Sequence, residues 1–207
     1  MTQLDERFMD ASAYHPPGKW EARITSLLVL VVAGLLLTGG WMFKDWMEDQ
    51  FRYLALDETE IAIPYPPAWE LRSNPDVGFL AVDPRSPSAF PPQEQVRILP
   101  LPDAALADFW PAERAATLND YIELERTQVR LKDGRDALLL AYTYAARPNG
   151  DHTPPLVAVR AVDLVFPARY AGEDRLVVLT LAAETDDWER AWPTFQRILA
   201  KLGVTQS

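Results

Sequence analysis

The sequence contains no cysteine, only two histidines, and fewer basic than acidic residues. The absence of cysteine excludes disulfides, thiolate metal sites, covalent haem attachment and a cysteine nucleophile. His15 and His152 are far apart in sequence, and a histidine-based metal site or catalytic triad would need most of the few histidines that the chain contains. The 20 basic and 30 acidic residues give a formal charge of −10, which repels phosphate backbones. We therefore expect no nucleic-acid partner.

Common catalytic motifs are also lacking. No serine lies in a Gly-x-Ser-x-Gly elbow, and no glycine-rich loop suited to phosphates is present. The acid pairs Glu58/Glu60 and Glu123/Glu125 are more typical of solvated charge than of paired catalytic acids or hard-cation ligands. His152 lies in a loop between prolines with no second histidine nearby. We predict no enzyme activity and no catalytic, cofactor-binding or metal-binding residue.

One long apolar stretch is the strongest positive signal. Residues 24–43 are twenty consecutive residues without an ionisable side chain, enough for a helix to cross a hydrocarbon core about 30 Å thick. Trp20 and Trp41 are separated by ~32 Å on such a helix, which suits a belt at each interface, and Trp46 can reinforce the second belt. The sequence predicts a single transmembrane helix.

A cleaved secretory signal is the alternative interpretation of this stretch. Signal peptides have an apolar region of about 7–15 residues that ends in small residues before the cut. Here residues 38–43 read Thr-Gly-Gly-Trp-Met-Phe, which is bulky where a peptidase requires small side chains. We therefore favour an uncleaved anchor in the bilayer of the cytoplasmic membrane.

Basic residues flanking the apolar stretch indicate its orientation. Lys19 and Arg23 lie close to its amino-terminal end, which favours an amino terminus on the cytoplasmic side. We expect a cytoplasmic tail over residues 1–19, a transmembrane helix with a juxtamembrane extension over 20–56, and an extracytoplasmic domain over 57–204. The extension is expected to continue the helix as an amphipathic segment or to lie at the interface, because apolar and acidic side chains are mixed in it.

Small residues recur within the predicted span. Ser26, Gly34 and Thr38 fall on a four-residue spacing that lets a second helix approach closely. An equally supported alternative is that these residues simply face the lipid. The predicted helix therefore either anchors the chain or packs against neighbouring transmembrane helices.

The rest of the chain is typical of an antiparallel sheet with helices. Extended patterns and turn signals predict strands over residues 59–63, 69–72, 78–82, 95–99, 129–131, 137–145, 156–166 and 175–183. Helical spacing predicts a helix over 112–128. Trp188, Trp192 and Phe195 begin an apolar stripe on a helix over 186–202, in which Pro193 is expected to cause a kink or a delayed start.

Two polar segments of the domain have functional and structural interpretations. Residues 83–92 form a proline-stiffened loop with an exposed-looking phenylalanine, which is either a contact loop or a simple strand connection. Glu184, Asp186 and Asp187 precede the last helix, where acidic residues are expected from the helix dipole without any bound cation.

Two segments carry a family resemblance. Residues 61–69 read Ile-Ala-Ile-Pro-Tyr-Pro-Pro-Ala-Trp and resemble the opening of PsbP-like and DcrB-like domains, in which a strand ends in Tyr-Pro before a short turn and Trp. The last strand and the helix that follows it are similar to the closing elements of that family. The fold-signature residues are Tyr65, Pro66, Trp69, Trp188, Trp192 and Phe195. The resemblance implies an α+β fold, a PsbP-like α/β sandwich with an antiparallel sheet flanked by helices.

The resemblance also implies a class of function. Members of this family are mostly non-enzymatic accessory proteins, assembly factors or envelope proteins. We expect an accessory or stabilising subunit that binds other integral subunits of a membrane complex for electron transfer, respiratory or photosynthetic, such as alternative complex III. The alternatives are a solitary envelope protein that holds a small apolar or peptide ligand between sheet and helix, an assembly factor, and a hydrolase with an unrecognised site.

Overall fold

The computed structural model describes residues 19–48, 50–55, 62–72, 78–147 and 156–204, and the chain divides into two compact units. The first unit, Met1–Asp49, contains helix α1 (Lys19–Glu48). The second unit, Gln50–Ser207, contains the sheets and the remaining helices. We describe each unit by itself.

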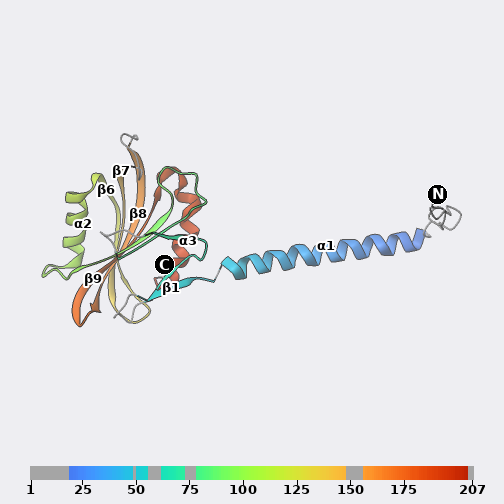
Figure 1. Ribbon diagram of the computed structural model, residues 1–207, viewed down its shortest axis with the longest axis horizontal. Helices are drawn as coiled ribbons and strands as arrows, with labels where there is room; N and C mark the ends of the chain where they lie inside the picture. The colour runs from blue at the N-terminus through green and yellow to red at the C-terminus, as the bar shows by residue number, and fades with distance from the viewer. Residues whose placement is uncertain (1–18, 49, 56–61, 73–77, 148–155, 205–207) are drawn as a thin grey trace, which may run out of the picture. The chain divides into compact units, whose positions relative to one another are not determined.

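The second unit is an α+β domain (Figure 1). Its elements are, in chain order, β1 (Arg52–Ala55), β2 (Ala62–Tyr65), β3 (Glu70–Arg72), β4 (Phe79–Val82), β5 (Gln93–Pro100), α2 (Leu106–Thr117), β6 (Asn119–Arg130), β7 (Asp136–Ala146), β8 (Val157–Tyr170), β9 (Glu173–Glu184), the 3-10 turn η3 (Thr185–Asp187) and α3 (Trp188–Lys201). Strands β3 to β9 form a seven-stranded antiparallel sheet in the order β3-β4-β5-β9-β8-β7-β6. Strands β1 and β2 form a separate antiparallel pair.

Helices α2 and α3 cover opposite faces of the large sheet, as Figure 1 shows. Side chains of β8 and β9 alternate between the two resulting cores because successive residues of a strand point to opposite faces. Leu179 and Leu181 face α3, whereas Val178 and Ala182 face α2. The predicted antiparallel sheet flanked by helices, preceded in the chain by one apolar helix, is confirmed.

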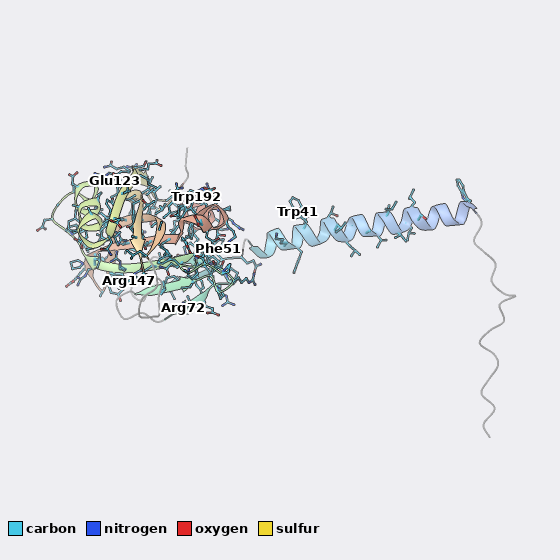
Figure 2. All side chains as sticks on the ribbon, turned by 90° about the horizontal axis from the view of Figure 1, so that it is seen from above. Trp41, Phe51, Arg72, Glu123, Arg147 and Trp192 are labelled. Atoms are coloured by element: carbon cyan, nitrogen blue, oxygen red, sulfur yellow. The ribbon has the colours of Figure 1, made fainter. Side chains whose placement is uncertain are left out.

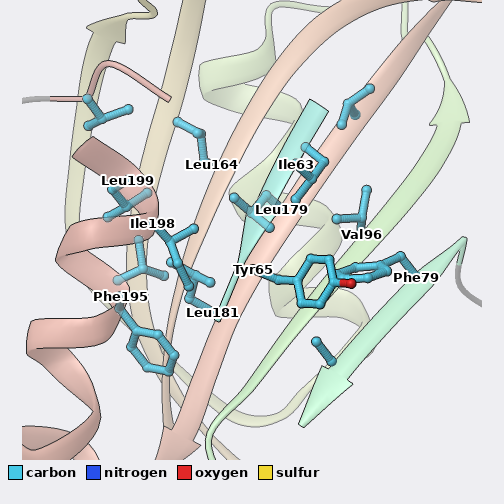
Figure 3. Close-up of a cluster of buried hydrophobic side chains, with 14 of the residues drawn as sticks. Ile63, Tyr65, Phe79, Val96, Leu164, Leu179, Leu181, Phe195, Ile198 and Leu199 are labelled. Carbon is cyan, nitrogen blue, oxygen red and sulfur yellow. The ribbon is translucent and has the colours of Figure 1, made fainter. Parts of the chain in front are cut away.

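The core on the α3 side combines Ile63 and Tyr65 of β2, near the start of the domain, with side chains of α3, at its end (Figure 3). Phe195, Ile198 and Leu199 of α3 are buried in the same cluster as Leu179 and Leu181 of β9. Burial of each such side chain contributes roughly 1.5–3 kcal/mol. The apolar stripe predicted for the last helix therefore lies against the sheet.

Gly203 ends helix α3 and lies against the β6–β7 turn. Gly203 has φ +91°, and its N–H bonds to the carbonyl of Ala200, while Val204 N–H bonds to Leu199 O, which is a Schellman ending of the helix. The carbonyl of Leu202 accepts from the N–H of Lys132 in the β6–β7 turn. A Cβ at Gly203 would lie 2.5 Å from Lys132, so the close approach requires glycine.

The helix predicted over residues 112–128 is wrong beyond its first third. Helix α2 runs from Leu106 to Thr117, Leu118 is extended, and the rest of the predicted helix belongs to the edge strand β6. Asp120 has φ +51°, and the pairing of β6 with β7 shifts register twice before residue 125. These irregularities interrupt the two-residue period, so the apolar residues fall at a helix-like spacing.

The segment predicted to be a juxtamembrane extension also differs from expectation. Helix α1 ends at Glu48, and Arg52–Ala55 pairs with β2 as strand β1 instead of continuing as helix or interfacial chain. Phe51 and Leu54 pack against the core on the α3 side, so the domain itself covers part of this apolar surface.

Pro193 lies inside α3, which begins at Trp188 after η3, two residues later than predicted.

Candidate functional site

A buried carboxylate lies between α2 and the sheet. Asp163 of β8 is fully buried and accepts hydrogen bonds from Trp110 Nε1 at 2.7 Å, Arg114 Nε at 2.7 Å, Tyr142 OH at 3.1 Å and Thr180 Oγ1 at 2.6 Å. The donors come from α2, β7 and β9, so one side chain joins four elements. A lone aspartate within the apolar run 156–166 was the sequence signal for this residue, and the sequence-based prediction missed it.

The surroundings of Asp163 hold it in place. Arg114 lies with its guanidinium 4.7 Å from the centre of the Trp110 ring and donates a second bond to Thr180 at 3.0 Å. Asp163 raises the pKa of Arg114 despite burial, and burial raises the pKa of the Tyr142 hydroxyl. A carboxylate buried behind four donors has no route to a substrate, so we interpret this cluster as the attachment of α2 to the sheet.

A groove opens on the opposite face, beside α3. It has a volume of about 290 Å³, and we call it the tryptophan groove. The residues that define it are Glu125 and Thr127 of β6, Arg160 of β8, and Trp188, Glu189 and Trp192 of α3, with further lining from β7 and β8. The indoles of Trp188 and Trp192 are stacked with centroids 5.3 Å apart, and Figure 2 labels Trp192 on the helix.

Charges of both signs line the tryptophan groove. The guanidinium of Arg160 lies 4.8 Å from the centre of the Trp188 ring, at the distance of a cation–π contact. Among the described residues, the buried Nε of Arg160 has no hydrogen-bond acceptor. Glu125 and Glu189 are exposed at the rim. The groove therefore offers a donor, two carboxylates and an aromatic surface.

A second cleft lies where α2 begins above the β6–β7 hairpin. Its volume is about 560 Å³. The lining residues are Ala105, Leu106, Ala107, Gln128, Val129, Arg130, Asp136, Ala137 and Leu138. Because apolar and charged side chains contribute together, this cleft is suited to an amphipathic ligand.

The loop at residues 83–92, for which a contact loop and a strand connection were equal alternatives, does not expose its phenylalanine. Phe90 is buried and packs edge to face with Tyr144 at a centroid distance of 6.5 Å. Ser86 Oγ donates to Asp187 Oδ2 at 2.8 Å, and Ser88 Oγ donates to Glu184. These bonds tie the loop to the start of α3, which leaves the strand-connection interpretation.

The acidic residues before α3 also bond to side chains, in addition to the helix-dipole role that was predicted. Asp187 is at the N-cap position but makes no side-chain capping hydrogen bond. It accepts from Ser86 and from Arg190 Nε at 2.6 Å, and the bond from Arg190 lowers the pKa of the Asp187 carboxyl. Its contribution is to hold a loop, because the acceptor oxygens face side chains and not the helix amides.

The predicted anchor residues lie on α1. The side chains of Trp20 and Trp41 are exposed on this helix, and Figure 2 labels Trp41, while the side chain of Trp46 lies outside the described residues. Ser26 and Gly34 are exposed too. Thr38 Oγ1 donates to the Gly34 carbonyl at 2.8 Å, so its hydroxyl bonds within its own helix.

The structure brings the fold-signature residues together. Tyr65 packs edge to face with Phe79, and Trp69 packs in the same way with Phe195 at 6.2 Å. The N–H of Trp69 bonds to the carbonyl of Pro66 at 3.1 Å and closes the turn between β2 and β3. Trp188 and Phe195 are buried in this core, and Trp192 lies at its margin.

Glu123 and Glu125, the candidate acid pair that the structure describes, have different surroundings. Glu123 pairs with Arg126 at 2.8 Å, whereas Glu125 faces the tryptophan groove. Within the ranges that the structure describes, no group of three His, Asp or Glu side chains is placed to hold a metal ion. Glu58, Glu60, His15 and His152 lie outside the described residues.

Comparisons with known proteins identify a fold and not a family. No protein-family model and no curated protein matches the chain. Among solved structures, LpqN of Mycobacterium tuberculosis, described as involved in cell envelope biogenesis, is 18% identical with a TM-score of 0.51, over 75% of this chain and 92% of LpqN. This likeness shows a shared fold.

Two further solved structures are similar over most of their length. CyanoP, the cyanobacterial PsbP of Synechocystis, is 15% identical with a TM-score of 0.48, over 73% of this chain and 91% of CyanoP. The Ran-binding protein Mog1p of Saccharomyces cerevisiae is 13% identical with a TM-score of 0.45, over 74% and 93% of the two chains. The fold that the PsbP-like resemblance implied is confirmed by the likeness to LpqN, and this likeness concerns the fold alone.

Proposed function

We propose that this chain is a membrane-anchored accessory protein of the cell envelope whose α+β domain docks onto other membrane proteins. The observation that carries the proposal is the segment Ser26–Lys44 of α1, with 19 residues, a mean hydropathy of 2.1 and no part buried within the structure. At 1.5 Å per residue this segment spans ~29 Å, which matches a bilayer core of about 30 Å. Burial in lipid would cover a helix surface that the protein leaves open.

In this proposal the domain at residues 57–204 is extracytoplasmic and the tail at 1–19 is cytoplasmic. Lys19 and Arg23 beside the span support this orientation. The fold shared with LpqN, a protein described as involved in cell envelope biogenesis, supports an envelope role. The host is a multi-subunit membrane complex for electron transfer, and this choice rests on the resemblance to PsbP-like domains.

Purification in a gentle detergent tests the docking role. Tagged full-length chain should bring other integral subunits along, which mass spectrometry would identify. The Gly34→Leu variant should lose them if the small-residue face packs against a neighbouring helix. Gly39→Leu is the matched control, because Gly39 lies about 140° around the helix from Gly34 and neither glycine has a neighbour within 4 Å of an added Cβ.

Two results would refute the proposal. A wild-type chain that purifies alone and monomeric would exclude a stable docking partner. A mature chain that begins beyond Phe43 would show that the apolar helix is a cleaved signal. Amino-terminal sequencing of the purified protein distinguishes this case from an uncleaved anchor.

The cleft of about 560 Å³ beside α2 favours a second candidate, a solitary envelope protein that binds a small amphipathic or peptide ligand. Native mass spectrometry of the purified chain would then detect a bound small molecule. Leu106→Trp, which fills the cleft, should remove that mass, whereas the exposed substitution Leu101→Trp should not. Absence of any bound mass in the wild-type chain would count against this candidate.

A further inference from the structure

Among the described residues, no strand pairs with the outer edge of strand β6. Strand β6 is the last strand in the order of the large sheet, and its residues are mostly exposed. The register shifts lie before Glu125, and from Glu125 to Arg130 the strand pairs residue for residue with β7. Within the part of the chain that the structure describes, the outer side of this regular stretch has no partner strand, which is the geometry that accepts an added strand.

The tryptophan groove lies directly beside this open stretch. Glu125 and Thr127 belong to both, because their side chains point to the α3 face and line the groove. Thr127 Oγ1 donates to Glu125 Oε1 at 3.2 Å. Successive side chains of an added strand alternate between faces, so every second side chain of that strand would lie beside the groove.

The charges at the groove select the kind of side chain that fits. The carboxylates of Glu125 and Glu189 are exposed at the rim, and the partly exposed indole of Trp192 lies between α3 and the strands. A cationic side chain is attracted both by carboxylates and by an indole face. The guanidinium of Arg160 is engaged over the Trp188 ring, so the exposed charges at the rim of the groove are the two carboxylates.

We propose that residues 125–130 of β6 and the tryptophan groove bind an extended segment of a partner protein, which adds to the sheet as a strand and places a lysine or arginine side chain beside Glu125, Glu189 and Trp192. The inference rests on the proposed docking role and names the chemistry of the docked segment. Backbone hydrogen bonds supply most of the affinity, and the basic side chain supplies the selectivity.

A peptide titration of the full chain in detergent micelles tests this inference. The probes are a capped pentapeptide, Thr-Val-Lys-Val-Thr, and its counterpart with Glu in place of Lys. The signal is the indole N–H resonance of Trp192, assigned from a Trp192→Phe variant. The lysine peptide should shift this resonance saturably, and the glutamate peptide should not. A lysine peptide with N-methylated backbone should bind at least about tenfold more weakly, because it cannot pair with the strand edge.

Matched substitutions separate the groove from the overall negative charge. The double variant Glu125→Gln/Glu189→Gln should weaken lysine-peptide binding at least about fivefold, as expected for two solvent-exposed charge contacts. Glu113→Gln is the control, because Glu113 is an exposed acid on α2, which covers the other face of the sheet. It should change binding by less than about twofold.

Three results would overturn the inference: no saturable shift, equal binding of the two peptides, or equal binding by the double variant and the wild-type chain. The docking role is judged separately by co-purification. If the peptide test fails and integral subunits still co-purify, the groove is excluded and the docking role stands. If the peptide binds and no subunit co-purifies, the groove stands and the stable complex is excluded.

Discussion

The buried carboxyl group of Glu94 makes the stability of this domain depend on pH. Glu94 of β5 is fully buried, and neither of its carboxyl oxygens has a hydrogen-bond partner among the described residues. Its neighbours across the sheet are Ala81 of β4 and Leu181 of β9, which offer no polar side chain. Burial therefore raises the pKa of Glu94 well above its ordinary value.

The sign of the effect follows from proton binding. The unfolded chain releases the Glu94 proton near pH 4.5, the ordinary pKa of a glutamate, whereas the folded protein retains it to a higher pH. The stabilising contribution is complete below the unfolded pKa and is lost as the pH rises toward the folded-state pKa. In that window the free energy of unfolding falls by about 1.4 kcal/mol per pH unit on account of this group.

Glu94→Gln removes the titration and keeps the shape of the side chain. We expect its stability relative to the wild-type chain to rise by about 1.4 kcal/mol per pH unit above pH 5, until the pH reaches the folded-state pKa of Glu94. Guanidinium unfolding of the full chain in micelles, followed by tryptophan fluorescence at pH 5, 6, 7 and 8, measures this difference. Glu113→Gln, at an exposed position, is the control and should show no such slope. A pH-independent difference for Glu94→Gln would refute the reasoning.

The remaining predictions concern the attachment of the helices and one turn, and each is measured by the same unfolding assay at pH 7. Arg114→Met should cost about 3–5 kcal/mol, because it leaves the buried Asp163 charge unpaired, whereas Arg130→Met at an exposed ion pair should cost less than about 1 kcal/mol. Gly203→Ala should cost more than about 1 kcal/mol through its positive φ and its contact with Lys132, and an unchanged stability would contradict the close approach. Ala171→Asn should stabilise by roughly 0.5–1 kcal/mol, because residue 171 has φ +51° in a two-residue hairpin turn that favours Asn-Gly, and a loss of stability would argue against that turn.

Elements with a strong local signal were predicted well. The strands predicted over residues 129–131 and 137–145 form the β6–β7 hairpin, and the turn between them contains Asp133-Gly134, with φ +88° at Gly134, a dipeptide that favours tight hairpin turns. The apolar stripe predicted α3, because a stripe of that period must lie against a core. The turn and the apolar stripe are each formed by residues that are close in sequence, so both elements can be predicted from the sequence alone.

Elements whose pattern depends on distant contacts were predicted poorly. Strand β6 is exposed on both faces for most of its length, so it lacks the alternation that marks a half-buried strand. Phe90 looked exposed because it lies among prolines, but Tyr144 and the rest of the α2-side core bury it. In both cases the decisive neighbours are far away in the sequence.

The amino-acid sequence by itself determined the apolar helix, the alternating strands and the closing helix, since hydrophobic period and length are properties of neighbouring residues. Only the tertiary structure decided which polar residues meet. Asp163 is joined to Trp110, Arg114, Tyr142 and Thr180 across 17 to 53 positions of sequence. The tryptophan groove likewise combines β6 with α3, because sheet order, and not chain order, places the edge strand near the last helix.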